Sequence, residues 1–415
     1  MRFDEFPGMT NAEWKQLIVK TIKAETEAEK LAFYDRQLVR NPEPGLEILP
    51  FYTPEDMVGL EYLQGFHRLL AQTKQTTGWM NVKPIAVYDE KTANEQAREA
   101  LAQGADAVEF DLLNRPGGKP MVGGGVTKEH LFNFQVLLHQ LSPLQTPVFF
   151  QMRQTDFANL NGYLAQSGAE TANAMGGITF EEIAIWDLVL DESARNAFAA
   201  AFQNSMVEKA QTPYFHSLMI GPVGESFSDG DSEMETFALP QSVLLANQLQ
   251  AATRLVNQLA EYGVAATQTL PQVGFVVDVE NDYFMEIAKL RALRLLWWQI
   301  GQLYDESLNL VNVFIHARTA NAIAPETEPH KNLISNTTQA MSAIIGGCDA
   351  LTVNGGGLAS EKDTILARRI ARNVSAVLKK ESYFDKVTDM GAGSYLIENL
   401  THQLAKAAWE RLLLP

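Results

Sequence analysis

The sequence predicts an α/β protein whose main unit is a (β/α)8 TIM-type barrel, preceded by an extended and helical N-terminal arm. From Trp79 onward, short apolar runs alternate with longer amphipathic stretches, a pattern typical of parallel strands joined by helices. The chain has 415 residues of which 46% are hydrophobic, enough to bury a large core. Periodicity also permits a doubly wound sheet, but the regular spacing favours the barrel. The expected division is an arm and linker at 1–78 and a barrel with C-terminal helices at 79–415.

The arm begins with an expected amphipathic helix. Thr10 or Asn11 is suited to cap it, and four apolar side chains then recur at helical spacing: Trp14, Leu17, Ile18 and Ile22. A proline-containing extended segment follows at 41–45. Such a helix packs either on its own barrel or on another surface, and the sequence leaves both alternatives open.

Seven or so strands are expected in the barrel region. They are Pro84–Val87, Asp106–Leu112, Pro147–Met152, His216–Ile220, Val273–Val279, Leu310–Ala317 and Asp349–Val353. The helices between them have recognisable ends, such as a capping aspartate or a terminating glycine. They are Lys91–Gln103 before Gly104, Lys128–Gln140, Glu192–Val207 after Asp191, and Pro240–Tyr262 before Gly263.

The last two expected strands form a βαβ unit with polar residues at their ends. His316, Arg318 and Thr319 cluster at the end of the first strand, and Asn354 closes the second before three glycines. In parallel sheets and barrels, ligands bind at the carboxyl ends of the strands. These four residues are therefore the candidate binding site.

Composition excludes several classes of function. The formal net charge of −17 opposes nucleic acid and anionic membrane surfaces as partners. No run of 18 apolar residues and no signal-like N-terminus occurs, so a soluble, cytoplasmic protein is expected. Cys348 is the only cysteine, and the seven histidines form neither HExxH nor an i, i+4 pair. No metal site is expected.

Two loops carry weaker signals. RPGGKPMVGGG at 115–125 has glycines that could cradle phosphate, although it lacks the GK[ST] end of a P-loop, and a mobile turn is the preferred interpretation. GPVGESFSDGDSEMET at 221–236 is rich in carboxylates but does not follow the EF-hand pattern, so a solvated acidic loop is favoured over a cation site. No GxSxG elbow occurs.

A longer pattern runs through the candidate site. It comprises HARTANAIAPETEPHKNLISNTTQAMSAIIGGCDALTVN at 316–354, with ENDYFMEIAKLRALRLLWW at 280–298 before it and ARRIARN at 367–373 and DMGAGSYLIENLTHQLAKAAWE at 389–410 after it. Near the N-terminus stand FPGMTNAEWKQLIVKTIK at 6–23 and LEILPFYTPED at 46–56. Together these segments resemble the methylmalonyl-CoA mutase family, specifically over about 280–410 and weakly over about 110–270.

The resemblance implies a barrel that performs radical isomerisation of acyl-CoA in propionate metabolism, with adenosylcobalamin held by a C-terminal domain carrying DxHxxG. This sequence contains no DxHxxG, so no cobalamin-binding domain is expected. The barrel also departs from the active pattern. The family's TxRQYAG segment corresponds to GWMNVKPIAVYDE here, where Tyr88 falls two residues past the family tyrosine. Pro222–Val223 stand in place of a family Tyr-His pair, and Gln272 and Gly274 stand in place of a family Arg-x-Ser. Arg318 replaces a family glutamine.

The resemblance therefore implies a small, non-catalytic subunit that forms a heterodimer with a large catalytic mutase subunit and stabilises it. It implies no catalytic residue and no cofactor in this chain, and adenosylcobalamin on the partner. His316, Arg318, Thr319 and Asn354 would be relics or residual acyl-CoA contacts. Two alternatives stay open: the active barrel half of a mutase whose cobalamin domain is separate or trimmed, and an unrelated acyl-CoA-binding barrel using His316, Arg318 and Asn354.

Overall fold

The computed structural model describes residues 8–74, 77–113, 132–141, 146–153, 176–180, 215–222, 239–320, 331–355 and 361–414. It also describes helical residues scattered between 156 and 203. The two sequence loops with weak signals fall almost entirely outside these residues: 115–125 completely, and 221–236 except for Gly221 and Pro222.

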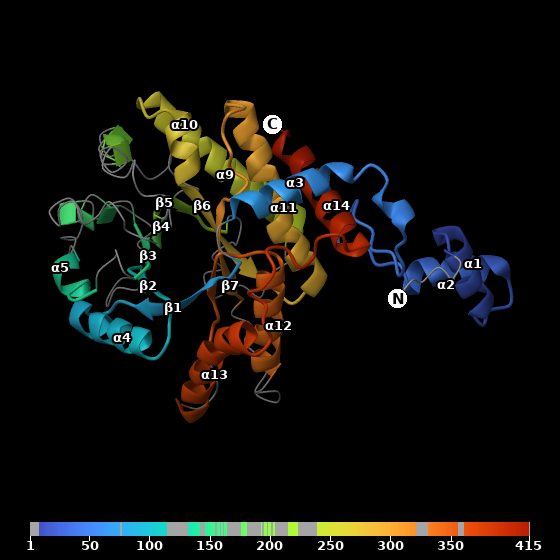
Figure 1. The fold of residues 1–415 in the computed structure, drawn as a ribbon, viewed down its shortest axis with the longest axis horizontal. Helices are drawn as coiled ribbons and strands as arrows, with labels where there is room; N and C mark the ends of the chain where they lie inside the picture. Colours follow the sequence, from blue (N-terminus) through green and yellow to red (C-terminus); the bar gives the residue numbers. More distant parts are fainter. Residues whose placement is uncertain are drawn as a thin grey trace, which may run out of the picture.

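Eight parallel strands form a closed barrel in which every strand pairs with its neighbours in sequence and the last pairs with the first (Figure 1). The strands are β1 (Met80–Ala86), β2 (Ala107–Asp111), β3 (Val148–Met152), β4 (Gly176–Phe180), β5 (Phe215–Ile220), β6 (Val273–Val279), β7 (Phe314–Thr319) and β8 (Ala350–Thr352). The predicted (β/α)8 fold is confirmed, and a doubly wound sheet is excluded because that sheet would be open.

Strand β4 is the one that the sequence did not reveal. Its sequence GGITF begins with two glycines, which are poor strand formers. Gly176 has φ +135, and a Cβ there would overlap the carbonyl oxygen of Val148, whereas a Cβ at Gly177 would meet the side chain of Met219. These glycines allow close approach of neighbouring backbones, so the features that hide the strand also let it fit.

The expected strand Leu310–Ala317 was wrong at its beginning. Residues 310–313 form a turn in which the Val313 N–H donates to the Leu310 carbonyl at 3.2 Å, and β7 starts only at Phe314. Leu310, Val311 and Val313 are apolar because they are buried in the core outside the barrel. Burial alone, without alternation, does not distinguish a turn from a strand.

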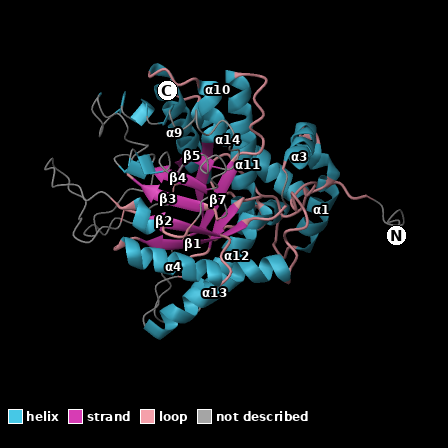
Figure 2. Ribbon diagram, turned by 60° about the vertical axis from the view of Figure 1, so that its left-hand side comes forward, coloured by secondary structure: helices cyan, strands magenta, loops and turns pink. Residues whose placement is uncertain are grey.

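Helices surround the barrel (Figure 2). They include α3 (Glu61–Thr73), α4 (Glu90–Ala102), α5 (Phe134–Leu137), α9 (Gln241–Glu261), α11 (Tyr283–Tyr304), α12 (Lys331–Ile345), α13 (Glu361–Lys380) and α14 (Tyr395–Leu412), with short turns η1 (Pro54–Met57), α10 (Ala266–Thr269) and η4 (Leu270–Gln272). The predicted helix near 91–103 is confirmed as α4, which Asp89 caps by accepting from the Thr92 N–H at 2.8 Å. The predicted Pro240–Tyr262 helix is confirmed as α9.

Two predicted helices are described only in part. Of 128–140, residues 134–137 are helical, 138–140 form a turn and 128–131 lie outside the described residues. The described positions from 192 to 203 are helical, whereas Asp191 and 204–207 lie outside. Among the helices that the structure describes, none is both long and apolar enough to cross a membrane.

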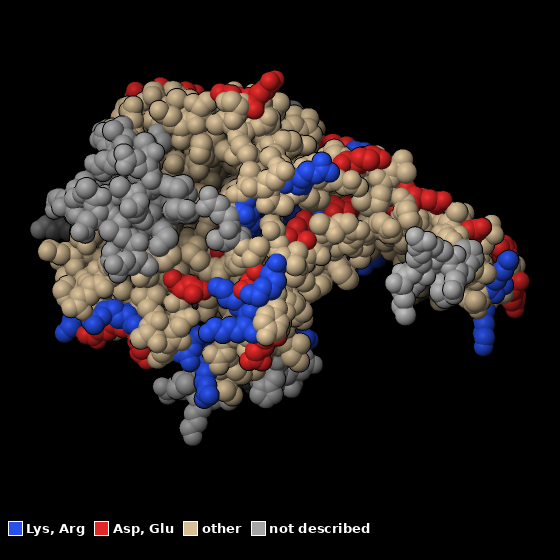
Figure 3. Space-filling model, in the orientation of Figure 1, with Lys and Arg blue, Asp and Glu red and all other residues tan. Residues whose placement is uncertain are grey.

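The N-terminal arm is a pair of short helices, α1 (Asn11–Thr21) and α2 (Glu27–Gln37), which extends away from the barrel (Figure 1). Each helix starts with a capping box, Thr10 with Glu13 and Thr26 with Glu29. Figure 3 shows charged side chains of both signs along the arm, while Lys and Arg gather over the lower part of the body, where Figure 1 places α13.

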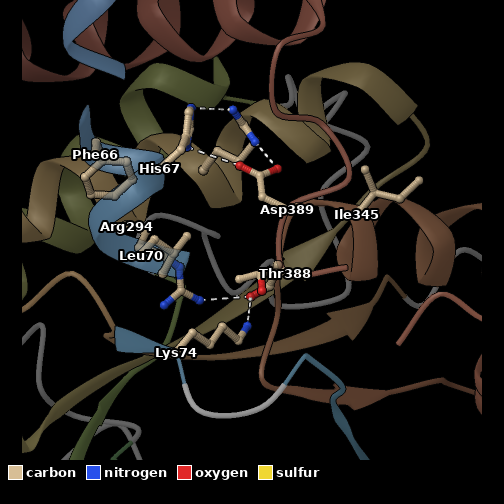
Figure 4. Close-up of a pocket in the computed structure, with 11 residues that line it drawn as sticks. Phe66, His67, Leu70, Lys74, Arg294, Ile345, Thr388 and Asp389 are labelled. Carbon is tan, nitrogen blue, oxygen red and sulfur yellow. Dashed lines mark hydrogen bonds and ion pairs between the residues drawn. The ribbon is translucent and has the colours of Figure 1, made fainter. Parts of the chain in front are cut away.

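Helix α11 packs between the barrel and α14, and two arginines on it are buried. Arg294 donates to the carbonyl oxygens of Val313 at 2.6 Å and Gly347 at 2.9 Å, and it pairs with Asp349, which Lys74 also contacts at 3.0 Å. Val313, Gly347 and Asp349 precede β7 and β8 in the chain, and Figure 4 shows the side chains of Arg294 and Lys74 directed towards the same point. The arginine thus ties α11 to the amino-terminal face of the barrel.

Arg291 occupies a second ionic cluster one helical turn away. Its guanidinium pairs with Asp389 and, at 2.9 Å, with Glu398, and both carboxylates also flank the ring nitrogens of His67 at 3.2 and 2.9 Å. Arg291 is 5% exposed. The cluster joins α3, α11, α14 and the loop before α14.

We expect Arg291→Met to lower the free energy of unfolding by about 3–5 kcal/mol, because it leaves the buried Glu398 carboxylate and the partly buried Asp389 carboxylate without their main cation. Urea denaturation followed by circular dichroism measures the change. The control is Lys15→Met, which breaks the exposed pair with Asp35 and should cost at most about 1 kcal/mol. Equal losses in the two variants would contradict the assignment.

Candidate functional site

Strand β7 presents alternate side chains to the two sides of the barrel wall. Ile315 and Ala317 belong to the outer apolar core, between the strands and the helices. Phe314, His316 and Arg318 therefore point into the barrel, since side chains alternate along a strand. Arg318 lies nearest the carboxyl end, where a ligand of a parallel barrel would be met.

His316 is completely buried and has one hydrogen-bond partner. Its Nε2 lies 2.9 Å from the Thr352 hydroxyl on β8. Its Nδ1 has no hydrogen-bond partner, with the nearest carboxylate oxygen, Glu109 Oε1, 4.0 Å away. Burial, reinforced by the nearby Arg318 charge, holds the pKa of His316 well below its usual value. The imidazole is neutral at physiological pH.

Arg318 is neutralised across the barrel by Glu109 of β2. Its Nη2 donates to Glu109 Oε1, and Glu109 is 3% exposed. Asp278 on β6 lies close enough to feel the same charge: burial raises its pKa, and Arg318 and Lys289 oppose that shift. The guanidinium is thus engaged by an internal carboxylate and is not a free cation at the barrel mouth.

Thr319 and Asn354 join the ends of β7 and β8. The Asn354 N–H donates to the Thr319 hydroxyl at 2.9 Å, and the Asn354 amide donates to the Thr319 carbonyl oxygen. Asn336 of α12 in turn donates to the Asn354 carbonyl oxygen. The structure therefore brings the four predicted residues together at neighbouring strands. Thr319 and Asn354, however, use their polar groups to hydrogen-bond each other.

Below His316 the barrel interior is filled by a column of rings. Ring centroids are 5.1 Å apart for His316 and Phe149, 5.8 Å for Phe149 and Phe314, and 4.8 Å for Phe314 and His216. Smaller apolar side chains pack around Phe149 and Phe314: Met80, Val82, Ala107 and Ala350. This ring column occupies the amino-terminal half of the barrel, because Phe314 and His216 lie at the starts of β7 and β5.

His216 is a neutral member of the ring column. Burial lowers its pKa to about 4, and Asp349 opposes the shift. Its Nδ1 is shielded from water and has no hydrogen-bond partner. It stands at the amino end of β5, so it does not take the place of the family Tyr-His pair, which is expected after that strand.

Sequence reasoning missed Glu109, Thr352, Phe149 and His216 as parts of this site. One signal was present in the sequence. Glu109 is a carboxylate in the middle of the apolar strand AVEFD, and burying its charge there would be costly without a paired group inside the protein. The residues aligned with family positions are placed elsewhere. Tyr88 is 66% exposed, and Gly274 is a packing glycine whose Cβ would touch Met219.

The arrangement limits the chemistry available at this site. Three buried nitrogens of the described site lack a hydrogen-bond partner: His216 Nδ1, His316 Nδ1 and Arg318 Nε. Among the described residues, no group of three His, Cys, Asp or Glu side chains is placed to hold a metal ion. A neutral imidazole and a paired guanidinium cannot supply the free charge that would grip a thioester or phosphate strongly.

Comparison with known proteins identifies relatives of this arrangement. The family model described as "Methylmalonyl-CoA mutase" matches residues 43–413. The methylmalonyl-CoA mutase small subunit of Porphyromonas gingivalis is 26% identical, over 99% of this chain and 63% of that protein. The methylmalonyl-CoA mutase of Rhizobium meliloti is 26% identical, over 96% of this chain and 57% of that protein.

A third relative matches a shorter region more closely. The probable methylmalonyl-CoA mutase small subunit of Mycobacterium bovis is 34% identical over 173 residues, which is 40% of this chain and 28% of that protein. The chain spans about six-tenths of the length of the first two relatives.

Acid should weaken the fold through His216 and His316. The pKa of His216 is about 4 in the folded chain and about 6.5 when unfolded, so the unfolded state binds more protons between these values. Its contribution to stability is intact above pH 6.5 and is lost as the pH falls towards 4, by up to about 3 kcal/mol. His316 adds a loss of the same sign. Urea unfolding at pH 7.5 and 4.5 measures it.

His216→Phe should keep the stacking on Phe314 and reduce this pH dependence, because the titrating ring is removed. The control is His139→Asn, since His139 is exposed, and this variant should leave the pH dependence as it is. An unchanged slope in His216→Phe would show that the buried ring does not control the acid response.

Glu109→Gln should destabilise the chain by about 3 kcal/mol, because Arg318 keeps its charge inside the barrel without a carboxylate. The double variant Glu109→Leu with Arg318→Met removes both charges and should recover most of that loss. A double-mutant cycle of Glu109→Leu, Arg318→Met and the double variant, measured by urea unfolding, tests this coupling. A loss in the double variant equal to the sum of the losses in these two single variants would argue against the pair.

Proposed function

The chain belongs to the methylmalonyl-CoA mutase family, and we propose that it is a small, non-catalytic subunit of such a mutase. It would pair with a cobalamin-dependent large subunit that interconverts methylmalonyl-CoA and succinyl-CoA, and would stabilise that subunit. The observation that carries the proposal is the Glu109–Arg318 ion pair, in which Glu109 neutralises the Arg318 guanidinium at the barrel mouth. The names of two of the three relatives described above support the subunit assignment.

Three described histidines are engaged by other side chains, which supports the proposal that this chain holds no cobalamin. His316, the histidine nearest the barrel mouth among them, is bound to Thr352 through Nε2 and packed beneath Arg318. His67 lies between two carboxylates and His402 is bound to Tyr62. Under the proposal, adenosylcobalamin is held by the partner, where it supplies the radical.

A second function, the active barrel half of a mutase, has one observation in its favour. The relative from Rhizobium meliloti carries the name of the whole enzyme and matches 96% of this chain. The free Nδ1 of His316 could then contact a substrate carbonyl once the Arg318 pair opened. Turnover by this chain together with a separate cobalamin-binding protein and adenosylcobalamin would establish this alternative.

We expect this chain to co-elute with the longer homologous subunit of the same organism in gel filtration, and to show no mutase turnover alone with adenosylcobalamin. In the pair, His316→Gln in this chain should leave kcat/KM unchanged within about 2-fold, whereas loss of a general acid or base typically costs at least about 100-fold. Glutamine keeps a hydrogen-bonding partner for Thr352, so folding is preserved.

Separate elution of the two chains would overturn the subunit assignment. A 100-fold loss of kcat/KM in His316→Gln, with co-elution intact, would show instead that this barrel performs catalysis.

A further inference from the structure

A groove with largely apolar walls runs between three helices on the outside of the barrel. It has a volume of about 470 Å³ and is bounded by α3, α11 and α14. Its apolar walls come from Leu296, Trp298, Leu303 and Trp409. A volume of this size with aromatic walls is typical of sites that bind small organic molecules.

The groove is preformed, because side-chain contacts join its three helices to one another. The His67 ring of α3 lies 2.9 Å from a carboxylate oxygen of Glu398 on α14 and 2.9 Å from the Arg291 guanidinium on α11. Phe66 of α3 packs against Trp298 of α11, with ring centroids 5.7 Å apart. A groove held in shape by such contacts loses little free energy in ordering itself around a ligand.

The groove carries a positive charge in an acidic chain. Lys406 of α14 lines it, and none of the described residues that line it is a carboxylate, although the formal net charge of the chain is −17. No hydrogen bond or ion pair joins Lys406 to another described residue. An ammonium group beside apolar walls is complementary to an apolar molecule that carries a carboxylate.

A second donor stands one helical turn before Lys406. The Tyr62 hydroxyl lies 2.8 Å from His402 Nδ1. Burial, with the Lys406 charge next, lowers the pKa of His402, so its ring is neutral at neutral pH. When Nδ1 accepts from the Tyr62 hydroxyl, Nε2 carries the proton of the neutral ring and can donate to a carboxylate. Residues four apart lie on the same face of a helix, so His402 and Lys406 provide two donors on one side of the groove.

We propose that the α3–α11–α14 groove binds a small carboxylate with an apolar acyl or aryl body. The apolar body would cover Trp298, Leu303 and Trp409, and the carboxylate would accept from His402 and Lys406. Leu303 is 73% exposed, so binding would remove apolar area from water. The inference does not depend on the proposed subunit role, since the free chain presents the same groove.

Octanoate is the probe for this site, and octan-1-ol is its uncharged match. Octanoate should change the tryptophan fluorescence saturably, because Trp298 and Trp409 line the groove. It should bind about 5-fold more tightly than octan-1-ol, as expected for one partly exposed ion pair, and added salt should weaken the binding of octanoate only. Equal affinities for the acid and the alcohol would contradict the proposal.

Replacing the lysine tests the origin of this preference. Lys406→Met should lower the affinity for octanoate about 5-fold and leave that for octan-1-ol within about 2-fold, since methionine keeps an apolar stem without the charge. Lys406→Arg should restore the binding of octanoate. The matched control is Lys380→Met, at an exposed lysine of α13, which should leave both affinities unchanged.

A single introduced thiol locates the bound probe. Cys348 is 3% exposed, and burial raises its pKa to about 12, so it does not react with maleimides. Leu303→Cys should be labelled about 10-fold more slowly when octanoate is present at about 10 times its Kd, since only the unliganded fraction reacts. The matched control is Val377→Cys on α13, a position 42% exposed outside the groove, which should be labelled at the same rate with and without octanoate.

The outcomes separate this inference from the subunit assignment. Octanoate binding that protects Leu303→Cys and weakens in Lys406→Met supports the inference, whether or not the chain co-elutes with a larger subunit. Octanoate that leaves Leu303→Cys fully reactive, or slows the labelling of Val377→Cys equally, does not bind in the groove, and the inference fails. Loss of octanoate binding when the larger subunit is bound would assign the groove to the contact between subunits and overturn the inference as well.

Discussion

The guanidinium of Arg318 has to be neutralised inside the barrel, and much of the interpretation depends on how this is done. A buried charge without a partner costs several kcal/mol. Glu109 meets the requirement from the opposite part of the barrel wall, 209 residues earlier in sequence. The same pair that stabilises the interior also engages the charge nearest the strand ends, where a ligand would bind. Beneath it, His316 and the ring column fill the space with neutral groups.

The ionic contacts that fix helix α11 lie in a different part of the molecule from the candidate site. Arg291 and Arg294 fasten α11 to α14 and to the amino-terminal face of the barrel, whereas His316, Arg318 and Glu109 occupy its interior nearer the opposite face. In TIM barrels, loops at the carboxyl face carry catalysis, and the other face carries stability. A barrel of this kind can therefore keep its shape while its interior side chains change. The Glu109–Arg318 pair is an example, because the barrel closes around this pair of charged side chains.

The sequence predicted the barrel well because its strands are short apolar runs with clear ends. It missed β4, whose glycines are required by contacts with β3 and β5, which local patterns do not contain. It predicted that His316, Arg318, Thr319 and Asn354 lie close together, and the structure brings them together on β7 and at the end of β8, although His316 lies inside the barrel and not at its edge. Their partners Glu109, Phe149 and Thr352 come from other strands, and the register that joins them is set by barrel closure.

The contrast between paired charges inside the protein and exposed apolar side chains on its surface indicates what kind of role suits this chain. In the interior, the charges of Arg318, Arg291 and Arg294 each meet a carboxylate, so the described barrel has little to gain by binding a charged ligand there. Outside, Leu303 and the arm residues Leu17 and Phe33 expose apolar area that folding has left in water. Covering such area is favourable by roughly 25 cal/mol per Å². Association with another protein, as proposed above, would draw on this free energy.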